Sequence, residues 1–479
     1  MTQILPRRGM HLAMLLGGSL LVGFSMGRWL APLAAWIGPV LIMRYARDHR
    51  VGRGYALVAV ACILAIFLAF ITIWWSGLPQ AMVPFLTVGF GLLWSLPYLA
   101  DRLMVARLPG FASTFIYPLA ATALEFLLVQ VNPLGAWGAT GFSQYGNLPL
   151  MQLASVTGII GITFLMGWFA SVANWAWENR SRGGEIRGGL AAFGVVFAAV
   201  FIFGFVRLNL PTSTETVRVA GITAVNFLET PDLKIGPIRD AYFGVTVREA
   251  QAGAKVIVWH ELAGMGPAAD EAPLIARAQE VARQQRIYLT IPLGTSYPNT
   301  DRPLENKLLL IDPTGAIAME HVKYGGNFIE GSLRGDGKLQ TVAAPFGVLS
   351  GVICWDMDFP AVIQQAGQNG TGLMLVPSAD WREIDPVHAQ MAVFRAIENG
   401  MSVVRQTYGG RSLAVDPYGH VLAEVDFFGS TDRTLVAQVP VRHVATLYTA
   451  FGRWLGWLCL VGFLFVVARA LIARRVPEI

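Results

Sequence analysis

The chain has 479 residues and a formal net charge of +5, with 54% hydrophobic and only 14% charged residues. Soluble proteins carry about 25% charged residues, so this composition excludes an ordinary soluble enzyme and predicts a membrane protein. The arginines lie beside apolar segments and not in one basic patch, which argues against a nucleic-acid partner.

Apolar segments dominate the first 210 residues, and each approaches the roughly 20 residues that a membrane-spanning helix needs. Arg7 and Arg8 before the first segment would also suit a signal peptide, but no small-residue cleavage site follows, so we interpret this segment as a retained helix. An eighth segment follows the polar part of the chain. The eight predicted spans are 10–27, 29–45, 55–76, 81–100, 110–130, 148–176, 187–207 and 449–471.

The arginines between these segments concentrate in alternate loops, and the stretch 131–147 carries no charge at all. Basic residues favour the cytoplasmic side of a membrane. The alternation therefore predicts that both termini are cytoplasmic and that residues 208–448 lie outside the cytoplasm. The predicted parts are a seven-helix transmembrane domain (1–210), an extracytoplasmic domain (211–446), and a C-terminal transmembrane helix with a cytoplasmic tail (447–479).

The polar domain has the pattern of an α/β fold, because short β-branched runs alternate with helical stretches at 272–285 and 388–400. The near-continuous apolar character of the runs predicts central strands that are covered on both faces. The motifs "DPTG" and "DPYG" predict turns, each followed by a further short strand. The predicted strands are 217–226, 254–261, 286–294, 306–315, 347–355 and 372–379.

The chain has three cysteines, of which Cys62 and Cys459 lie in apolar runs and Cys354 ends a predicted strand. Three cysteines cannot form a disulfide framework, and no C-x-x-C or H-x-x-x-H spacing indicates a zinc site. We expect no metal and no organic cofactor. A lone thiol in an exported domain is either buried and inert or kept for its reactivity.

Three reactive side chains lie at strand ends of the polar domain: Glu261, Lys323 and Cys354. In open α/β sheets, functional groups gather beyond the carboxyl ends of strands. A carboxylate can take the proton of a thiol, and an ammonium group can stabilise the oxyanion that forms when the thiolate attacks a carbonyl. Each residue alone also has a structural interpretation, as a buried small side chain, an ion-pair partner or a solvated lysine. Together they favour covalent acyl chemistry.

At these residues the sequence resembles the carbon–nitrogen hydrolase (nitrilase) superfamily. The resemblance rests on "GVICWDMDFP", "ENKLLLIDPTGAIAMEHVK" and "RAIENGMSVVRQTYGGRSLAVDPYGHVLAE". It implies that residues 211–446 form an αββα sandwich with a Glu–Lys–Cys triad. Glu261 would be the base, Lys323 the oxyanion lysine and Cys354 the nucleophile. Glu330, in "NFIEGS", would be the second glutamate that supports the lysine.

The membrane part resembles the bacterial apolipoprotein N-acyltransferases, a membrane branch of that superfamily with eight spans and the sandwich inserted between the last two. The loop "GFSQYGN" and Glu125 also fit that family. The resemblance implies an enzyme of the cytoplasmic (inner) membrane. Such an enzyme takes an acyl chain from a phospholipid onto its cysteine and passes it to the N-terminal amine of a diacylglyceryl-cysteine apolipoprotein.

Side chains beside the triad are candidates for substrate contact: Trp355, Asp356 and Trp381. Both tryptophans are equally compatible with ordinary packing, and His260 is expected to be a packed supporting residue rather than a proton carrier. The loop "WREIDPVH" is shorter than the family pattern. Two alternatives therefore stay open: a membrane-anchored amidase or nitrilase-type hydrolase (or an acyltransferase with another amine acceptor), and a catalytically silent binding protein.

Overall fold

The computed structural model describes residues 7–108, 110–211, 215–225 and 234–472. The chain divides into two compact units. The helical unit consists of Met1–Val131, Trp137–Leu208 and Arg453–Ile479, and the second unit of Asn132–Ala136 and Asn209–Gly452. The short segment Asn132–Ala136 thus belongs to the second unit although it lies between two helical stretches in sequence.

Within the described residues of the helical unit, five helices are long and apolar enough to cross a membrane, or six if one bent pair counts as a single span. The predicted number of eight is therefore not confirmed. The helices of this unit are α1 (Arg7–Phe24), α2 (Pro32–Asp48), α3 (Val51–Gly77), α4 (Met82–Met104), α5 (Ile116–Val131), α6 (Leu148–Met151), α7 (Ala154–Thr157), α8 (Ile160–Glu178), α9 (Gly183–Leu208) and α16 (Trp454–Ile472).

The first two helices are not among the helices that are long and apolar enough to span a membrane. The apolar part of α1 covers only Gly9–Phe24, and α2 has 17 residues. The chain turns between them at Gly27, whose φ is +62° and whose missing Cβ would lie 2.2 Å from the carbonyl oxygen of Ala69. Only glycine fits such a close approach in a left-handed conformation, so the turn ends the first helix early.

The segment predicted as one span over 148–176 is broken. Helix α7 ends at Gly158, which has a φ of +71°, and the helical segments Leu148–Thr157 and Ile160–Glu178 are bent by 114° relative to each other. A positive φ interrupts the right-handed helix at a residue that carries no Cβ. The predicted span over 148–176 is therefore confirmed only if the two bent segments count as one span.

The second unit contains two β-sheets packed face to face. As far as this unit is described, the first sheet has the order β13-β1-β2-β4-β5-β6, with β3 beside β4, and the second has the order β12-β11-β10-β9-β8-β7. The strands are β1 (Thr216–Ile222), β2 (Val256–Trp259), β3 (Gly266–Pro267), β4 (Tyr288–Ser296), β5 (Glu305–Ile311), β6 (Ile317–Val322), β7 (Thr341–Ala344), β8 (Gly347–Gly351), β9 (Leu373–Ala379), β10 (Ser402–Tyr408), β11 (Arg411–Val415), β12 (Val421–Asp426) and β13 (Thr434–Pro440).

The central strands of both sheets run parallel, with β1, β2 and β4 in the first and β8, β9 and β10 in the second. Inward side chains of the two sheets form one apolar cluster, which includes Val258, Leu308, Leu349 and Leu375. The six predicted strands coincide with β1, β2, β4, β5, β8 and β9 to within a few residues, whereas β10 is not among the predicted ones. Because both faces of each sheet are covered, the apolar side chains do not simply alternate along the strands.

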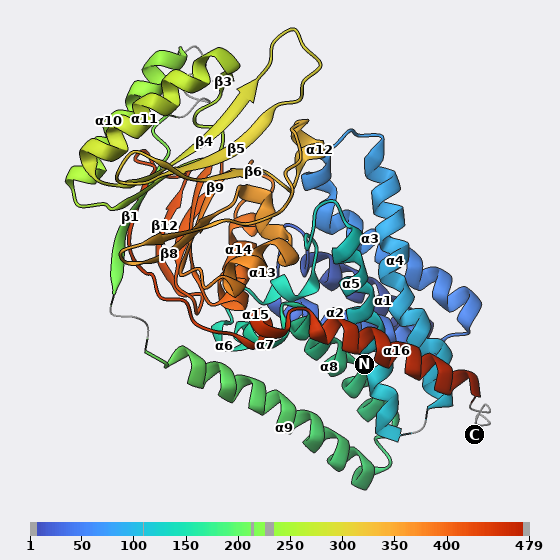
Figure 1. Cartoon of the computed structure of the whole chain (residues 1–479). Helices are drawn as coiled ribbons and strands as arrows, with labels where there is room; N and C mark the ends of the chain where they lie inside the picture. The colour runs from blue at the N-terminus through green and yellow to red at the C-terminus, as the bar shows by residue number, and fades with distance from the viewer. Residues whose placement is uncertain (1–6, 109, 212–214, 226–233, 473–479) are drawn as a thin grey trace. The chain divides into compact units, whose positions relative to one another are not determined.

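Helices cover the outer face of each sheet (Figure 1). Helices α10 (Ile235–Gln251) and α11 (Glu271–Gln285) pack on the first sheet around Tyr242, Trp259 and Ala278. Helices α13 (Pro360–Gln368) and α14 (Val387–Asn399) cover the second sheet. The layers are therefore α, β, β and α, and the carboxyl ends of β2, β8 and β9 carry the candidate site.

Candidate active site

The two carboxylates and the ammonium group predicted from the sequence meet in one place. Lys323 directly follows β6, and its Nζ donates to Glu261 Oε1 at 2.6 Å and to Glu330 Oε2 at 2.8 Å. Glu261 and Lys323 are only 2% and 3% exposed. Burial alone would lower the pKa of Lys323, but Glu261, Cys354 and Glu330 outweigh it and hold that pKa above its ordinary value. The lysine therefore stays charged.

Asn306 completes this carboxylate cluster, and the sequence reasoning missed it. Its Nδ2 donates to Glu261 Oε1 at 2.7 Å and lies 3.3 Å from both oxygens of Glu330. The backbone N–H of Ala379 donates to Glu261 Oε2 at 2.8 Å. The available signal for Asn306 was a polar side chain at the start of β5. It lies directly across from the strand end that carries Lys323. Glu261 is thus held by three donors, from β5, β9 and the residue that follows β6.

Cys354 lies next to this cluster at the turn after β8. It is 2% exposed and has a φ of +45°. Its Sγ lies 3.7 Å from the carbonyl oxygen of Ala379 and 4.0 Å from Asp380 Oδ1. Burial and the charge of Glu261 raise the pKa of Cys354, and Lys323 opposes that rise. The resting group is a neutral thiol, which needs a base to become a nucleophile.

Asp356 connects the turn that carries Cys354 to the loop that follows Lys323. Its Oδ1 accepts from the backbone N–H groups of Tyr324 and Gly325 at 2.9 and 2.8 Å. Its Oδ2 lies 3.0 Å from the N–H of Ile353 and 2.7 Å from His321 Nε2. The residue is fully buried. The geometry favours a positioning role for Asp356 over the expected contact with substrate.

The two candidate tryptophans pack against each other. The ring centroids of Trp355 and Trp381 are 6.0 Å apart, and the Trp355 ring lies 5.2 Å from that of His388. Trp355 is 5% exposed, whereas Trp381 is partly exposed. Of the two, Trp381 therefore offers the larger surface to an incoming molecule.

A second charged cluster beside Cys354 contains Asp358, Asp380, His388 and Arg405, which the sequence reasoning also missed. Cys354, Asp380 and His388 lie close enough to ligate a metal ion. However, Arg405 Nη2 already lies 2.8 Å from Asp380 Oδ1 and 3.1 Å from His388 Nδ1. The guanidinium occupies the place of a cation, so these residues do not fit a metal. A charged residue inside the apolar strand "SVVRQTY" was the available signal.

His260 supports the base through the backbone. Its Nδ1 lies 2.6 Å from the carbonyl oxygen of Glu261, and burial lowers its pKa to about 4. A neutral imidazole at physiological pH agrees with the expected packing role. Next to it, Glu261 and Ala379 border a cavity of about 530 Å³. Its other walls are mostly apolar and include Ile235, Ile238, Leu262, Met265 and Pro267.

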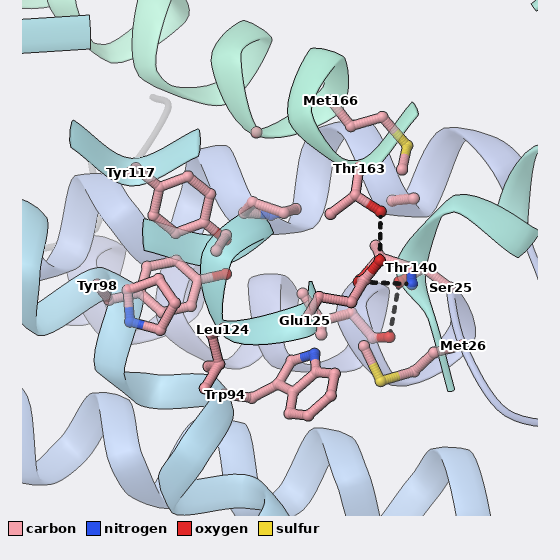
Figure 2. Close-up of a pocket in the computed structure, with 16 residues that line it drawn as sticks. Ser25, Met26, Trp94, Tyr98, Tyr117, Leu124, Glu125, Thr140, Thr163 and Met166 are labelled. Atoms are coloured by element: carbon pink, nitrogen blue, oxygen red, sulfur yellow. Dashed lines mark hydrogen bonds between the residues drawn. The ribbon is translucent and has the colours of Figure 1, made fainter. Parts of the chain in front are cut away.

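The helical unit contains a buried glutamate of its own (Figure 2). Glu125 is 4% exposed, and its carboxylate accepts from the N–H of Thr140 at 2.9 Å and from the hydroxyl of Thr163 at 2.8 Å. It borders a cavity of about 50 Å³. Figure 2 shows Trp94, Tyr98 and Tyr117 around the same cavity.

Comparisons with known proteins agree with both units. The family Carbon-nitrogen hydrolase matches residues 242–448, and the Apolipoprotein N-acyltransferase N-terminal domain matches residues 17–172. An apolipoprotein N-acyltransferase of Geobacter metallireducens is 24% identical over 97% of this chain and 96% of its own length. One from Rhodopseudomonas palustris is 27% identical over 78% of this chain and 75% of its own length.

The chain is thus similar to apolipoprotein N-acyltransferases over nearly its whole length, and its polar domain matches the carbon-nitrogen hydrolase family. The two matched regions fall in the predicted membrane part and in the predicted polar domain, as the sequence resemblance implied. The solved structure of an amidase from Nesterenkonia sp. matches with a TM-score of 0.40 and 21% identity over 48% of this chain and 92% of that chain. That likeness is too distant to carry any part of the assignment.

Proposed function

We propose that this protein is a phospholipid-dependent N-acyltransferase of the bacterial inner membrane. It would move an acyl chain, through a thioester on Cys354, to the N-terminal amine of diacylglyceryl-cysteine apolipoproteins. The observation that carries the chemical part is the position of Lys323 Nζ, 2.6 Å from Glu261 and 2.8 Å from Glu330, in a cluster whose charge acts on the Cys354 thiol. The similarity to apolipoprotein N-acyltransferases supports the choice of a phospholipid and an apolipoprotein as substrates.

In the first half-reaction, Glu261 accepts the thiol proton as Cys354 attacks the ester carbonyl of the phospholipid. The charge that develops on the carbonyl oxygen is stabilised by Lys323, which is buried and therefore acts with little screening. The tetrahedral intermediate collapses, the carbon–oxygen bond breaks, and the leaving lyso-lipid oxygen takes the proton from Glu261. The product is a thioester on Cys354.

In the second half-reaction, the neutral amine of the apolipoprotein attacks the thioester. Glu261 accepts the proton of the amine and Lys323 again stabilises the oxyanion. The carbon–sulfur bond breaks, and the proton returns from Glu261 to the thiolate. Each step conserves the proton between the base and the reacting groups, so no cofactor is needed. The apolar cavity beside Glu261 would help to keep water from the thioester.

The proposed topology follows the arginine pattern, with both termini in the cytoplasm and the sandwich outside it. A phospholipid cannot easily leave the bilayer, so an enzyme that acts on it must work at the membrane surface. Membrane helices before and after the sandwich in sequence would hold it there. Eight spans remain part of this proposal, with the two short helices α1 and α2 included.

Acyl transfer to the thiol can be tested with the full-length protein in lipid nanodiscs that contain isotope-labelled phospholipid. Mass spectrometry should find the acyl mass on the peptide that contains Cys354, together with lyso-lipid. Cys354→Ala should give neither product. Addition of a diacylated lipopeptide should then release the acyl chain as an amide.

Absence of both adduct and lyso-lipid would contradict the proposal. Release of free fatty acid without transfer to the lipopeptide would instead identify a hydrolase of the same fold. Acyl mass on the peptides that contain Cys62 or Cys459, retained in Cys354→Ala, would contradict the role of Cys354.

A further inference from the structure

The charged cluster on the Asp380 side of Cys354 has no part in the steps described above. Asp380 Oδ1 lies 4.0 Å from Cys354 Sγ, and it accepts from Arg405 Nη2 at 2.8 Å. His388 Nδ1 lies 2.8 Å from the same oxygen, and His388 Nε2 lies 3.0 Å from Asp358 Oδ2. The side chains of Asp358, Asp380, His388 and Arg405 are at most 2% exposed. An imidazole therefore bridges two buried carboxylates.

The doubly protonated form of His388 satisfies both carboxylates, because each ring nitrogen then donates to one of them, and the Nδ1 contact with Asp380 at 2.8 Å is shorter than the 3.1 Å contact with Arg405 Nη2. A neutral ring would direct a lone pair at one of the two acids. The charged groups that face His388 are Asp358 in the nucleophile turn, Asp380 after β9 and Arg405 on β10, with the thiol of Cys354 near them. Burial alone would lower the pKa of His388, but the two aspartates outweigh it and raise that pKa.

The same bridge connects the nucleophile turn to α14. Asp358 and Cys354 belong to one short 3-10 turn, Cys354–Asp358, and His388 is the second residue of α14. The carbonyl oxygen of Asp358 also accepts from the N–H of Ala136 at 2.7 Å. The turn that carries the thiol is thus held from its far end by a charged hydrogen bond.

We propose that Asp358, His388 and Asp380 form a charged hydrogen-bond relay beside Cys354, in which His388 is a positioning residue. As an imidazolium, His388 fixes the turn through Asp358 and offsets the negative charge that Asp380 places 4.0 Å from the sulfur. The relay therefore sets how easily the thiol ionises, while Glu261 removes the proton. This inference rests on the proposed role of Cys354 as the nucleophile.

The relay predicts opposite effects for two substitutions that would act alike if the cluster only held the fold together. Asp380→Asn removes a negative charge beside the sulfur, so the thiolate forms more easily. His388→Gln removes the compensating positive charge, so the thiolate forms less easily. A charge at this range shifts a pKa by about one unit or more, which corresponds to about tenfold in thiolate population.

The experiment measures the rate at which iodoacetamide alkylates Cys354 in the full-length protein, between about pH 6 and pH 9, where histidine and thiol groups titrate. Mass spectrometry of the Cys354 peptide excludes signals from Cys62 and Cys459. At neutral pH we expect about tenfold faster alkylation in Asp380→Asn and about tenfold slower alkylation in His388→Gln. The double variant should return close to the wild-type rate.

His420→Gln is a matched control, because His420 pairs with Asp416 at 2.8 Å in the same unit but is half exposed. It should leave the pH profile unchanged. Rates that fall in both single variants, or pH profiles that superimpose on the wild type, would overturn the relay. Thermal melting identifies a single variant that is unfolded. In that case the alkylation rate of the double variant decides between the two interpretations. Failure of the wild-type thiol to accept an acyl group would refute the proposed function instead.

Discussion

Glu125 in the helical unit and Glu261 in the sandwich are both buried, and both accept a hydrogen bond from a backbone N–H. The donors are Thr140 for Glu125 at 2.9 Å and Ala379 for Glu261 at 2.8 Å. Their remaining partners differ. Glu261 receives the ammonium group of Lys323, whereas Glu125 receives the hydroxyl of Thr163 (Figure 2).

This difference in partners indicates two different roles for a buried carboxyl group. A buried charge is costly unless an opposite charge compensates it. Lys323 supplies that compensation, so Glu261 keeps a lone pair for proton transfer next to a thiol. The partners found for Glu125 are neutral donors, and a neutral amide could satisfy them equally well. Burial and hydrogen bonding are common to both glutamates, and the neighbouring cation and thiol are what favour Glu261 over Glu125 as the base in the proposed mechanism.

The largest effect is expected from Glu261→Gln. The amide keeps the size of the side chain but cannot accept the thiol proton, so thioester formation should slow about 10²- to 10⁴-fold, the usual contribution of a general base. Quenched time points of Cys354 acylation, measured by mass spectrometry, give the rate. A loss below tenfold would show that another group serves as the base.

Lys323→Met should destabilise the sandwich, because it leaves Glu261 and Glu330 facing each other without the shared cation. Removal of one partner from a buried ion pair costs about 3–5 kcal/mol. Thermal melting should show this loss, and lower pH should restore part of it by protonating one glutamate. Lys307→Met is the matched control, since Lys307 contacts Glu271 at 2.6 Å but is less buried. Equal losses in both variants would contradict the special position of Lys323.

His388→Gln should make stability depend differently on pH. The pKa of His388 is raised in the folded protein, so its contribution to stability is complete below its ordinary value of about 6.5. That contribution is lost as the pH rises through the folded value. The melting temperature of the variant should therefore lie furthest below wild type in mild acid and approach it in alkali. A constant difference at all pH values would mean that the imidazole is not charged.

Glu125→Gln should have the smallest effect, below about 1 kcal/mol. The amide oxygen can still accept from Thr140, and the amide nitrogen can donate to the hydroxyl of Thr163. Melting temperature and thioester formation rate both test this expectation. A fall in the rate of thioester formation as large as that in Glu261→Gln would show that function requires a charged carboxylate at Glu125. The two glutamates would then not differ in the way described above.

The sequence predicted most of the sandwich and the candidate residues because strand periodicity and strand ends are local signals. Glu261, Lys323 and Cys354 each end or follow an apolar run, and parallel strands bring such ends to one edge. The relay residues were not predicted, because their role depends on contacts between β9, β10 and α14, which are distant in sequence. Breaks in the membrane helices escaped as well, since hydropathy does not register a single left-handed residue such as Gly158.

The backbone at Cys354 has a consequence for how such proteins lose activity. A φ of +45° favours glycine over any residue with a Cβ. On backbone conformation alone glycine would be favoured at this position, whereas the proposed acyl transfer requires the sulfur atom of cysteine. Relatives that have abandoned acyl transfer should drift toward glycine at this position, and Cys354→Gly should melt at a higher temperature than Cys354→Ala. Under the proposed function, the chemical requirement for a thiol at position 354 thus opposes the conformational preference of the backbone for glycine.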